Sequence, residues 1–235
     1  YDVAGFAQGS GNIVSVAIDT FTGISGLIAN TSYEFYVRDY CGATDSSNWA
    51  GPFTFQTPCA VYVPDYTEDF ASFVPSCWDL ASDGNIATGP IGNGAGEWAH
   101  GSYLNAGGVN DATKINLYNI GSYEWLISPT FDLSAGNWEL NIDAGVTAWD
   151  ATTAIAMGSD DTVQVLISTD GGSSWAAIYT WDVNNQPDEL GSTFTMDLSA
   201  YTSATSQFAI WATEGAIDDA EDLDFHIGNF SIDMT

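Results

Sequence analysis

The stretch EWLISPTFDLSAGNWELNID, residues 124–143, decides the fold class of this chain. Its last part, Trp-Glu-Leu-Asn-Ile-Asp, alternates between apolar and polar residues, which is the period of a β-strand with one buried face. The part TFDLSA (130–135) is a strand end followed by turn residues, and it recurs as TMDLSA (195–200). The repetition indicates a sandwich built from similar strand-and-turn units.

The same period of two continues along most of the chain. Runs rich in aromatic and β-branched residues are separated by Gly, Asn, Asp and Ser, which are typical of turns. No window shows the i, i+3, i+4, i+7 pattern of a helix. We therefore predict an all-β protein with strands within residues 33–40, 138–146, 162–168, 174–181, 206–213 and 224–232.

The charge of the chain excludes several classes of partner. Its 235 residues include 31 acidic and 2 basic side chains, so the formal net charge is −29. Such a surface repels phosphate backbones and anionic lipids, which argues against nucleic-acid binding and membrane binding. There is no apolar run long enough for membrane insertion. The hydrophobic fraction of 45% is still sufficient for a folded core.

The composition changes near residue 60, where prolines interrupt two β-rich stretches. The stretch VYVPDY (61–66) is typical of a short extended linker. We predict a first domain at 1–58, a linker at 59–65 and a larger domain at 66–235.

The first domain carries the motifs GLIANTSYEFYVRDYC (26–41) and SNWAGPFTFQT (47–57). These resemble the C-terminal part of a fibronectin type III module. The resemblance implies a partial sandwich in which Tyr33 packs at a corner. Because the first two strands of the family are missing, we expect upstream residues or a neighbouring copy to cover the open edge.

The second domain carries an ordered series of short motifs. Together they resemble the MAM-like, cleaved-adhesin or choice-of-anchor J domains of secreted Bacteroidetes-type proteins. The resemblance implies a larger antiparallel jelly-roll β-sandwich and a non-catalytic role in adhesion. The motifs are YTEDF (66–70), PSCW (75–78), EWLISPTFDLSAGNWELNID (124–143), SDDTVQVLISTDGGSSW (159–175), TFTMDLSAY (193–201) and DFHIGNFSI (224–232).

The three cysteines are Cys41, Cys59 and Cys77, without a CxxC motif or paired histidines, which makes a zinc site improbable. If the strands around Cys41 and before Cys59 form a hairpin, these two residues lie roughly 20 Å apart, too far for a disulfide. We predict a Cys59–Cys77 disulfide, with three buried thiols as the alternative.

Calcium is the metal that so many acidic side chains favour. Glu68 shares a strand face with Phe70, and an acid directed toward the core needs a cation or several donors. If first and last strands are neighbours, as the resemblance implies, Asp222, Asp224 and Asn229 lie beside it. We predict a structural Ca²⁺ site at these four residues, with a solvated acidic face as the alternative. Gly228 departs from the family, whose members often have Asp there.

No catalytic motif is present, so we predict no enzymatic activity. His100 and His226 are interpreted as structural residues. Sugars stack on exposed aromatic rings, and Trp98, Trp149 and Trp181 fall near predicted loops or strand ends. These three are the candidates for sugar stacking.

The combined prediction is a secreted, non-catalytic module, attached to the cell surface through a larger parent protein and stabilised by calcium. Its partner would be a cell-surface glycan, a surface protein or neighbouring copies of itself. Two alternatives stay open. One is an accessory carbohydrate-binding module of a secreted hydrolase, and the other is a structural repeat of a stalk or filament.

Overall fold

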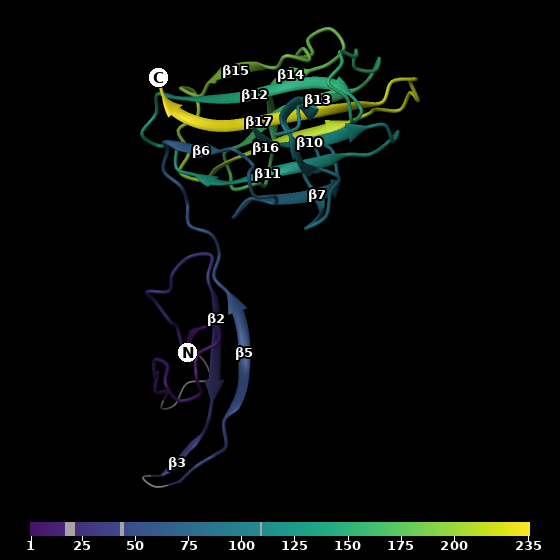
Figure 1. Cartoon of the computed structure of the whole chain (residues 1–235). Helices are drawn as coiled ribbons and strands as arrows, with labels where there is room; N and C mark the ends of the chain where they lie inside the picture. Colours follow the sequence, from purple (N-terminus) through teal and green to yellow (C-terminus); the bar gives the residue numbers. More distant parts are fainter. Residues whose placement is uncertain (17–21, 43–44, 109) are drawn as a thin grey trace. The chain divides into compact units, whose positions relative to one another are not determined.

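A computed structural model describes residues 1–16, 22–42, 45–108 and 110–235 (Figure 1). The chain divides into two compact units, Tyr1–Ala60 and Val61–Thr235. The regular structure is almost entirely antiparallel β-strand, which confirms the predicted all-β class. Within the described ranges, no helix has the length and apolar character needed to span a membrane.

The first unit contains a three-stranded sheet of order β1-β2-β5, with β2 and β5 side by side in Figure 1. Tyr33 on β2 is 5% exposed and is the one buried hydrophobic side chain among the described residues of this unit. Its hydroxyl accepts a hydrogen bond of 2.9 Å from the backbone N–H of Ile28. The strands are β1 (Asp2–Val3), β2 (Ser32–Val37), β5 (Ala50–Gln56) and the small hairpin β3 (Tyr40–Gly42) and β4 (Asp45–Ser46).

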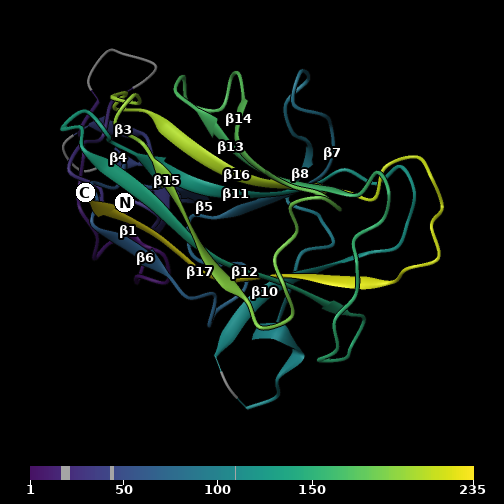
Figure 2. The same cartoon turned by 90° about the horizontal axis from the view of Figure 1, so that it is seen from above.

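The second unit is a sandwich of two sheets, seen as two layers in Figure 2. One sheet has the order β15-β12-β17-β10-β9, and β6 pairs with the C-terminal part of β17. The strands of this first sheet are β6 (Tyr66–Glu68), β9 (Ala99–Ser102), β10 (Asp111–Leu117), β12 (Trp138–Ala148), β15 (Ser192–Asp197) and β17 (Leu223–Met234).

The second sheet has the order β14-β13-β16-β11-β7-β8. Each of the six stretches that the sequence predicted contains a strand: β2, β12, β13, β14, β16 and β17. The strands of this sheet are β7 (Asp79–Asp83), β8 (Ile91–Asn93), β11 (Glu124–Phe131), β13 (Thr162–Ser168), β14 (Ala176–Trp181) and β16 (Ser206–Thr213).

Alternate residues of facing strands fill the space between the two sheets. Leu140 and Ile142 of β12 and Phe208 of β16 are completely buried in one continuous cluster. Their neighbours in the sequence point away from this space, because successive side chains of a strand lie on opposite faces. The alternation in the sequence thus corresponds to the buried face of each strand.

The outer face of the second sheet has a smaller core of its own, which includes Trp125, Ile127, Trp175 and Trp211. The backbone carbonyl of Gly84 accepts hydrogen bonds from the indoles of Trp125 (2.9 Å) and Trp211 (3.2 Å). The segment that follows β7 therefore covers this face. Burial on both faces explains the uninterrupted apolar run Trp125-Leu126-Ile127 in β11.

The short 3₁₀ turn η1 (Tyr103–Asn105) packs against β10, β12 and β17 on the outer face of the first sheet. Asp143 pairs with Asn229 and Ala144 with Ile227, so Gly228 is the extra residue of a β-bulge. A Cβ atom at Gly228 would lie 2.7 Å from the ring of Tyr103. An aspartate at this position would require the Tyr103 ring to shift.

Candidate functional site

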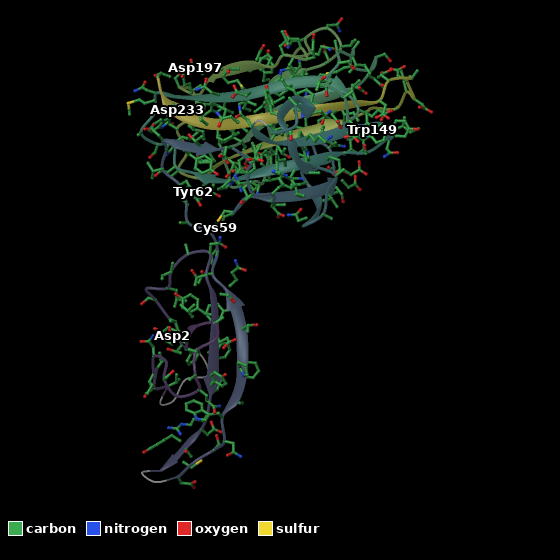
Figure 3. All side chains as sticks on the ribbon, viewed as in Figure 1. Asp2, Cys59, Tyr62, Trp149, Asp197 and Asp233 are labelled. Carbon is green, nitrogen blue, oxygen red and sulfur yellow. The ribbon has the colours of Figure 1, made fainter. Side chains whose placement is uncertain are left out.

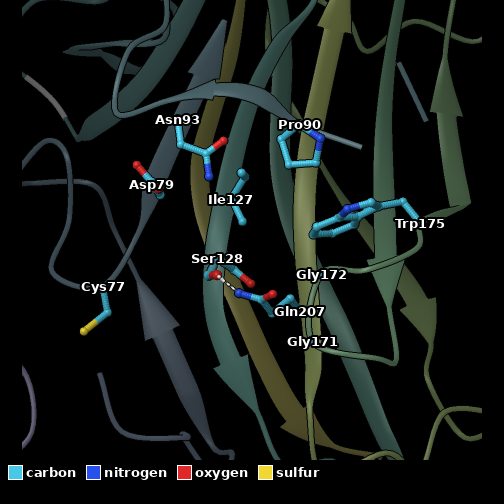
Figure 4. Close-up of a pocket in the computed structure, with 10 residues that line it drawn as sticks. All are labelled: Cys77, Asp79, Pro90, Asn93, Ile127, Ser128, Gly171, Gly172, Trp175 and Gln207. Carbon is cyan, nitrogen blue, oxygen red and sulfur yellow. Dashed lines mark hydrogen bonds between the residues drawn. The ribbon is translucent and has the colours of Figure 1, made fainter. Parts of the chain in front are cut away.

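A surface pocket of about 340 Å³ lies on the outer face of the second sheet. This volume is at the lower end of the range for ligand pockets, roughly 300–1,000 Å³. Figure 4 shows the side chains around it, which come from β7, β8, β11, β16 and the turn after β13. The lining residues are Cys77, Asp79, Pro90, Asn93, Ile127, Ser128, Gly171, Gly172, Trp175 and Gln207.

A break in strand pairing shapes the middle of the pocket. The register of β11 against β16 shifts between Ile127 and Thr130, which removes Ser128 from the ladder. Its hydroxyl accepts a hydrogen bond from Phe208 N–H (2.8 Å). Its carbonyl accepts one from the Gln207 amide (3.4 Å), which Figure 4 shows. Bulges commonly redirect side chains beside binding sites.

The wall of the pocket offers both an aromatic surface and polar groups. Trp175 is 8% exposed, and its indole N–H has no hydrogen-bond partner in the structure. Asp79 and Asn93 are exposed on the opposite wall. The indoles of Trp98, Trp138 and Trp181 also have buried N–H groups without a partner, so this feature is not specific to the pocket.

Sequence reasoning missed this pocket. Most of the surface of Trp175 is buried in the smaller core on the second sheet. The signal that could have found it is Gln207, a polar residue in the apolar run QFAIWA, together with the turn DGGSS just before Trp175. That these two segments face one another follows only from the strand order β13-β16-β11.

The predicted sugar-stacking tryptophans have different environments. Trp98 is 2% exposed and Trp181 is completely buried in the main core, so neither ring has a free face. The prediction is wrong for these two residues, because the strands around them direct their rings between the sheets. Trp149 is 56% exposed and lies at the opposite end of the unit from Asp197 and Asp233 (Figure 3).

The four residues predicted to bind calcium do not form one site. The strands β6 and β17 are neighbours, but Glu68 pairs with Phe230, six positions from Asp224. At about 3.4 Å per residue, the two acids are roughly 20 Å apart along the strand. The pairing of β6 with β17 therefore shows that the predicted four-residue site is wrong. Calcium binding itself stays a prediction. In the described part of the chain, no three His, Cys, Asp or Glu side chains are arranged around a metal position.

Each of these residues has a local partner instead. Glu68 accepts hydrogen bonds from Phe70 N–H (2.9 Å) and the Tyr66 hydroxyl (3.4 Å), and burial raises the pKa of its carboxyl. Asp222 accepts one from the Asn116 amide (2.6 Å). Asn229 lies opposite Asp143 on β12.

Asp224 is neutralised by one of the two basic residues of the chain. The Lys114 ammonium lies 2.7 Å from its carboxylate and 3.0 Å from that of Asp150. The Asp224 side chain is 1% exposed. Burial alone would lower the pKa of Lys114, but its hydrogen bonds to Asp224 and Asp150 raise it. Asp224 is thus held by an ion pair inside the protein.

Two of the three cysteines are disulfide-bonded and the third is free. Cys59 and Cys77 are disulfide-bonded. Cys41 is free and exposed. The two cysteines that the sequence predicts to be disulfide-bonded are therefore the bonded ones.

The fold is similar to those of several solved structures. The K1 cleaved adhesin domain of Lys-gingipain from Porphyromonas gingivalis W83 has a TM-score of 0.48 at 17% identity, covering 72% of this chain and 98% of that domain. TmCBM61, solved in complex with β-1,4-galactotriose, has a TM-score of 0.41 at 12% identity, covering 68% of this chain and 90% of that one. At these identities the similarity concerns the β-sandwich fold alone. No family model and no curated protein matches the sequence.

The buried His226 provides a pH-dependent prediction. Its Nε2 lies 3.0 Å from the Thr147 hydroxyl, and both side chains are fully buried, which hides this pair from any substrate. Burial lowers the pKa of His226 to about 4, against an opposing effect of Asp224. The unfolded imidazole, with a pKa of about 6.5, binds its proton first as the pH falls. We expect a loss of about 3 kcal/mol of unfolding free energy between pH 6.5 and 4 from this residue.

Comparison with His226→Gln isolates this contribution, since the amide can still bond to Thr147 but does not titrate. Urea unfolding of both proteins at several pH values measures it. The difference in unfolding free energy should change by about 3 kcal/mol over this interval. Parallel curves for the two proteins would show that folding does not lower the pKa of His226.

Proposed function

We propose that the second unit is a non-catalytic module that binds neutral sugar chains in the pocket between β7, β11 and β16. The chain would act outside the cell, as part of a secreted or surface-attached protein that mediates adhesion. The disulfide-bonded Cys59 and Cys77 support this location, because disulfides persist in oxidising compartments.

The observation that carries the proposal is the chemistry of the pocket wall. The Trp175 indole lies on one wall of the pocket, and the amides of Asn93 and Gln207 and the carboxylate of Asp79 are the polar groups of the remaining lining. Sugar rings offer apolar C–H faces to aromatic residues and hydroxyl groups to amides and carboxylates. No basic residue lines the pocket, which favours a neutral over an anionic ligand.

The same lining argues against hydrolysis of a bound sugar. Glycosidases with the usual mechanism need two carboxyl groups about 5–10 Å apart. Asp79 is the one carboxylate among the lining residues. A binding role therefore fits the pocket better than a catalytic one.

Titration of the whole chain with neutral oligosaccharides tests the proposal. Binding to a panel of β-linked galactan, xylan and glucan oligomers should be detectable by calorimetry for at least one of them. Gln207→Ala removes an amide of the pocket, and we expect its Kd to rise about tenfold, which corresponds to one or two lost hydrogen bonds. Asn93→Ala should have a similar effect.

Trp149→Ala is the matched control, because Trp149 is exposed at an end of the unit and does not line the pocket. Its Kd should stay within about twofold of the parent. Loss of binding in Trp149→Ala with normal binding in Gln207→Ala would show that the sugar binds at Trp149 and not in the pocket. Absence of binding to every neutral glycan tested would argue against a sugar-binding role.

We also propose that the first unit is the C-terminal part of a fibronectin type III module. The support is the Ile28 N–H that bonds to the Tyr33 hydroxyl, as in the tyrosine corner of such sandwiches. Val37 and Phe53 on its sheet are 51% and 47% exposed. Upstream residues or a neighbouring copy would cover these side chains.

A further inference from the structure

Two acidic residues meet at one end of the second sheet. Thr162 at the start of β13 pairs with Thr213 at the end of β16, which places Asp161 and Glu214 next to each other just beyond the ladder. They are 2% and 4% exposed. Like charges opposite one another on neighbouring strands are destabilising, so this arrangement needs an explanation.

Two more carboxylates approach the same place. A Cβ atom at Gly158 would lie 2.9 Å from an oxygen of Asp161 and would overlap an oxygen of Glu221, so both carboxylates converge on this glycine. Asp160 accepts hydrogen bonds from Ala216 N–H (2.8 Å) and the next N–H of the loop. We call Asp160, Asp161, Glu214 and Glu221 the carboxylate cluster.

Several oxygens of the carboxylate cluster have no partner. Oδ1 of Asp160, Oε2 of Glu214 and Oε1 of Glu221 are buried without a hydrogen bond. Burial and the neighbouring carboxylates raise the pKa of Glu214 to about 7, and burial raises that of Asp161 to about 6. A buried carboxylate without a countercharge or a donor costs several kcal/mol.

The described residues provide no countercharge for the carboxylate cluster. Lys114 is bonded to Asp224 and Asp150. The other basic residue, Arg38, belongs to the first unit and lies over the ring of Trp49. Two ways to neutralise the carboxylate cluster remain: protonation of its acids, or a metal cation from solution.

We propose that the carboxylate cluster binds a calcium ion. The donors are all oxygens, without a Cys or His in the set, and Ca²⁺ accepts six to eight oxygen ligands in adaptable geometries. Mg²⁺ requires near-ideal octahedral geometry and gives up water reluctantly. The carboxylates are not yet arranged around one point, so binding would rotate the flexible side chains of Glu214 and Glu221. Gly158 keeps the position between them open.

Thermal unfolding of the whole chain after chelator treatment tests this site. Addition of Ca²⁺ at about 100 times its Kd should raise the midpoint by about 5–10 °C, at ionic strength matched with NaCl. Calorimetry should show this binding as well, and an equal concentration of Mg²⁺ should give a smaller shift. A midpoint that Ca²⁺ does not change, or an equal response to Mg²⁺, would overturn the proposal.

The variant Glu214→Gln tests whether the calcium-dependent rise in the midpoint comes from the carboxylate cluster. We expect its Kd for Ca²⁺ to rise at least about tenfold, while in chelator it should melt at or above the parent midpoint because a buried unpaired carboxylate is gone. Asp161→Asn is the second variant if the first folds poorly. Glu68→Gln is the matched control and should keep the full calcium response. A response lost in Glu68→Gln and kept in Glu214→Gln would overturn the assignment.

Discussion

Replacement of Lys114 with methionine is expected to destabilise the second unit by about 3–5 kcal/mol. The variant leaves the Asp224 carboxylate, 1% exposed, without the ammonium that lies 2.7 Å away. The remaining donors to this carboxylate are the Asn105 amide and the Asp150 N–H, which carry no charge. Urea unfolding followed by near-ultraviolet circular dichroism measures the change.

Arg38→Met is the control, because it removes the same charge from the only other basic residue. Arg38 is exposed and lies 4.5 Å from the centre of the Trp49 ring, so we expect a cost below about 1 kcal/mol. Adding Asp224→Asn to Lys114→Met should restore most of the stability. Equal losses in the two single variants would mean that the net charge, and not the buried pair, matters.

Replacement of Trp181 with alanine should cost about 3–5 kcal/mol. This ring is completely buried and contacts the rings of Tyr179, Phe194 and Phe225 at centroid distances of 5.0–5.3 Å. The variant would leave a large cavity between the two sheets, since strands cannot easily collapse around a missing indole. Denaturant unfolding at neutral pH measures the loss.

The comparison for Trp181→Ala is Trp149→Ala, which removes the same side chain from an exposed position. Its unfolding free energy should stay within about 0.5 kcal/mol of the parent. The two tryptophans are indistinguishable by their place near strand ends in the sequence. Similar losses for both variants would show that the ring of Trp149 is buried in solution.

Five strands of the second unit could be predicted, because their side chains alternate between the two faces of the sheet. In β12, Leu140 and Ile142 face the core while Glu139 and Asn141 face outward, and this alternation is visible in the sequence. This alternation is less clear in β11, because Trp125 and Leu126 are both buried, on opposite faces of the strand. There the sequence indicates a buried strand but does not show what covers its outer face.

The candidate sites depended on strand register and on covering loops, which the sequence does not encode locally. The pairing of Glu68 with Phe230 separates it from Asp224, although both strands are neighbours as expected. The pairing of Thr162 with Thr213 brings Asp161 beside Glu214, although no motif connects them. A shift of one residue in either pairing would turn these side chains to the other face.

By itself, the sequence determined the all-β class and the positions of six strands, and its net charge of −29 is the reason to expect no nucleic-acid or anionic-membrane partner. These properties follow from local periodicity and from composition, which do not depend on long-range contacts. The tertiary structure alone decided that Lys114 neutralises Asp224, that Trp181 is core, and that Trp175 and Gln207 share a pocket. Each of these depends on segments far apart in the chain, which come together only when the two sheets close over a common core.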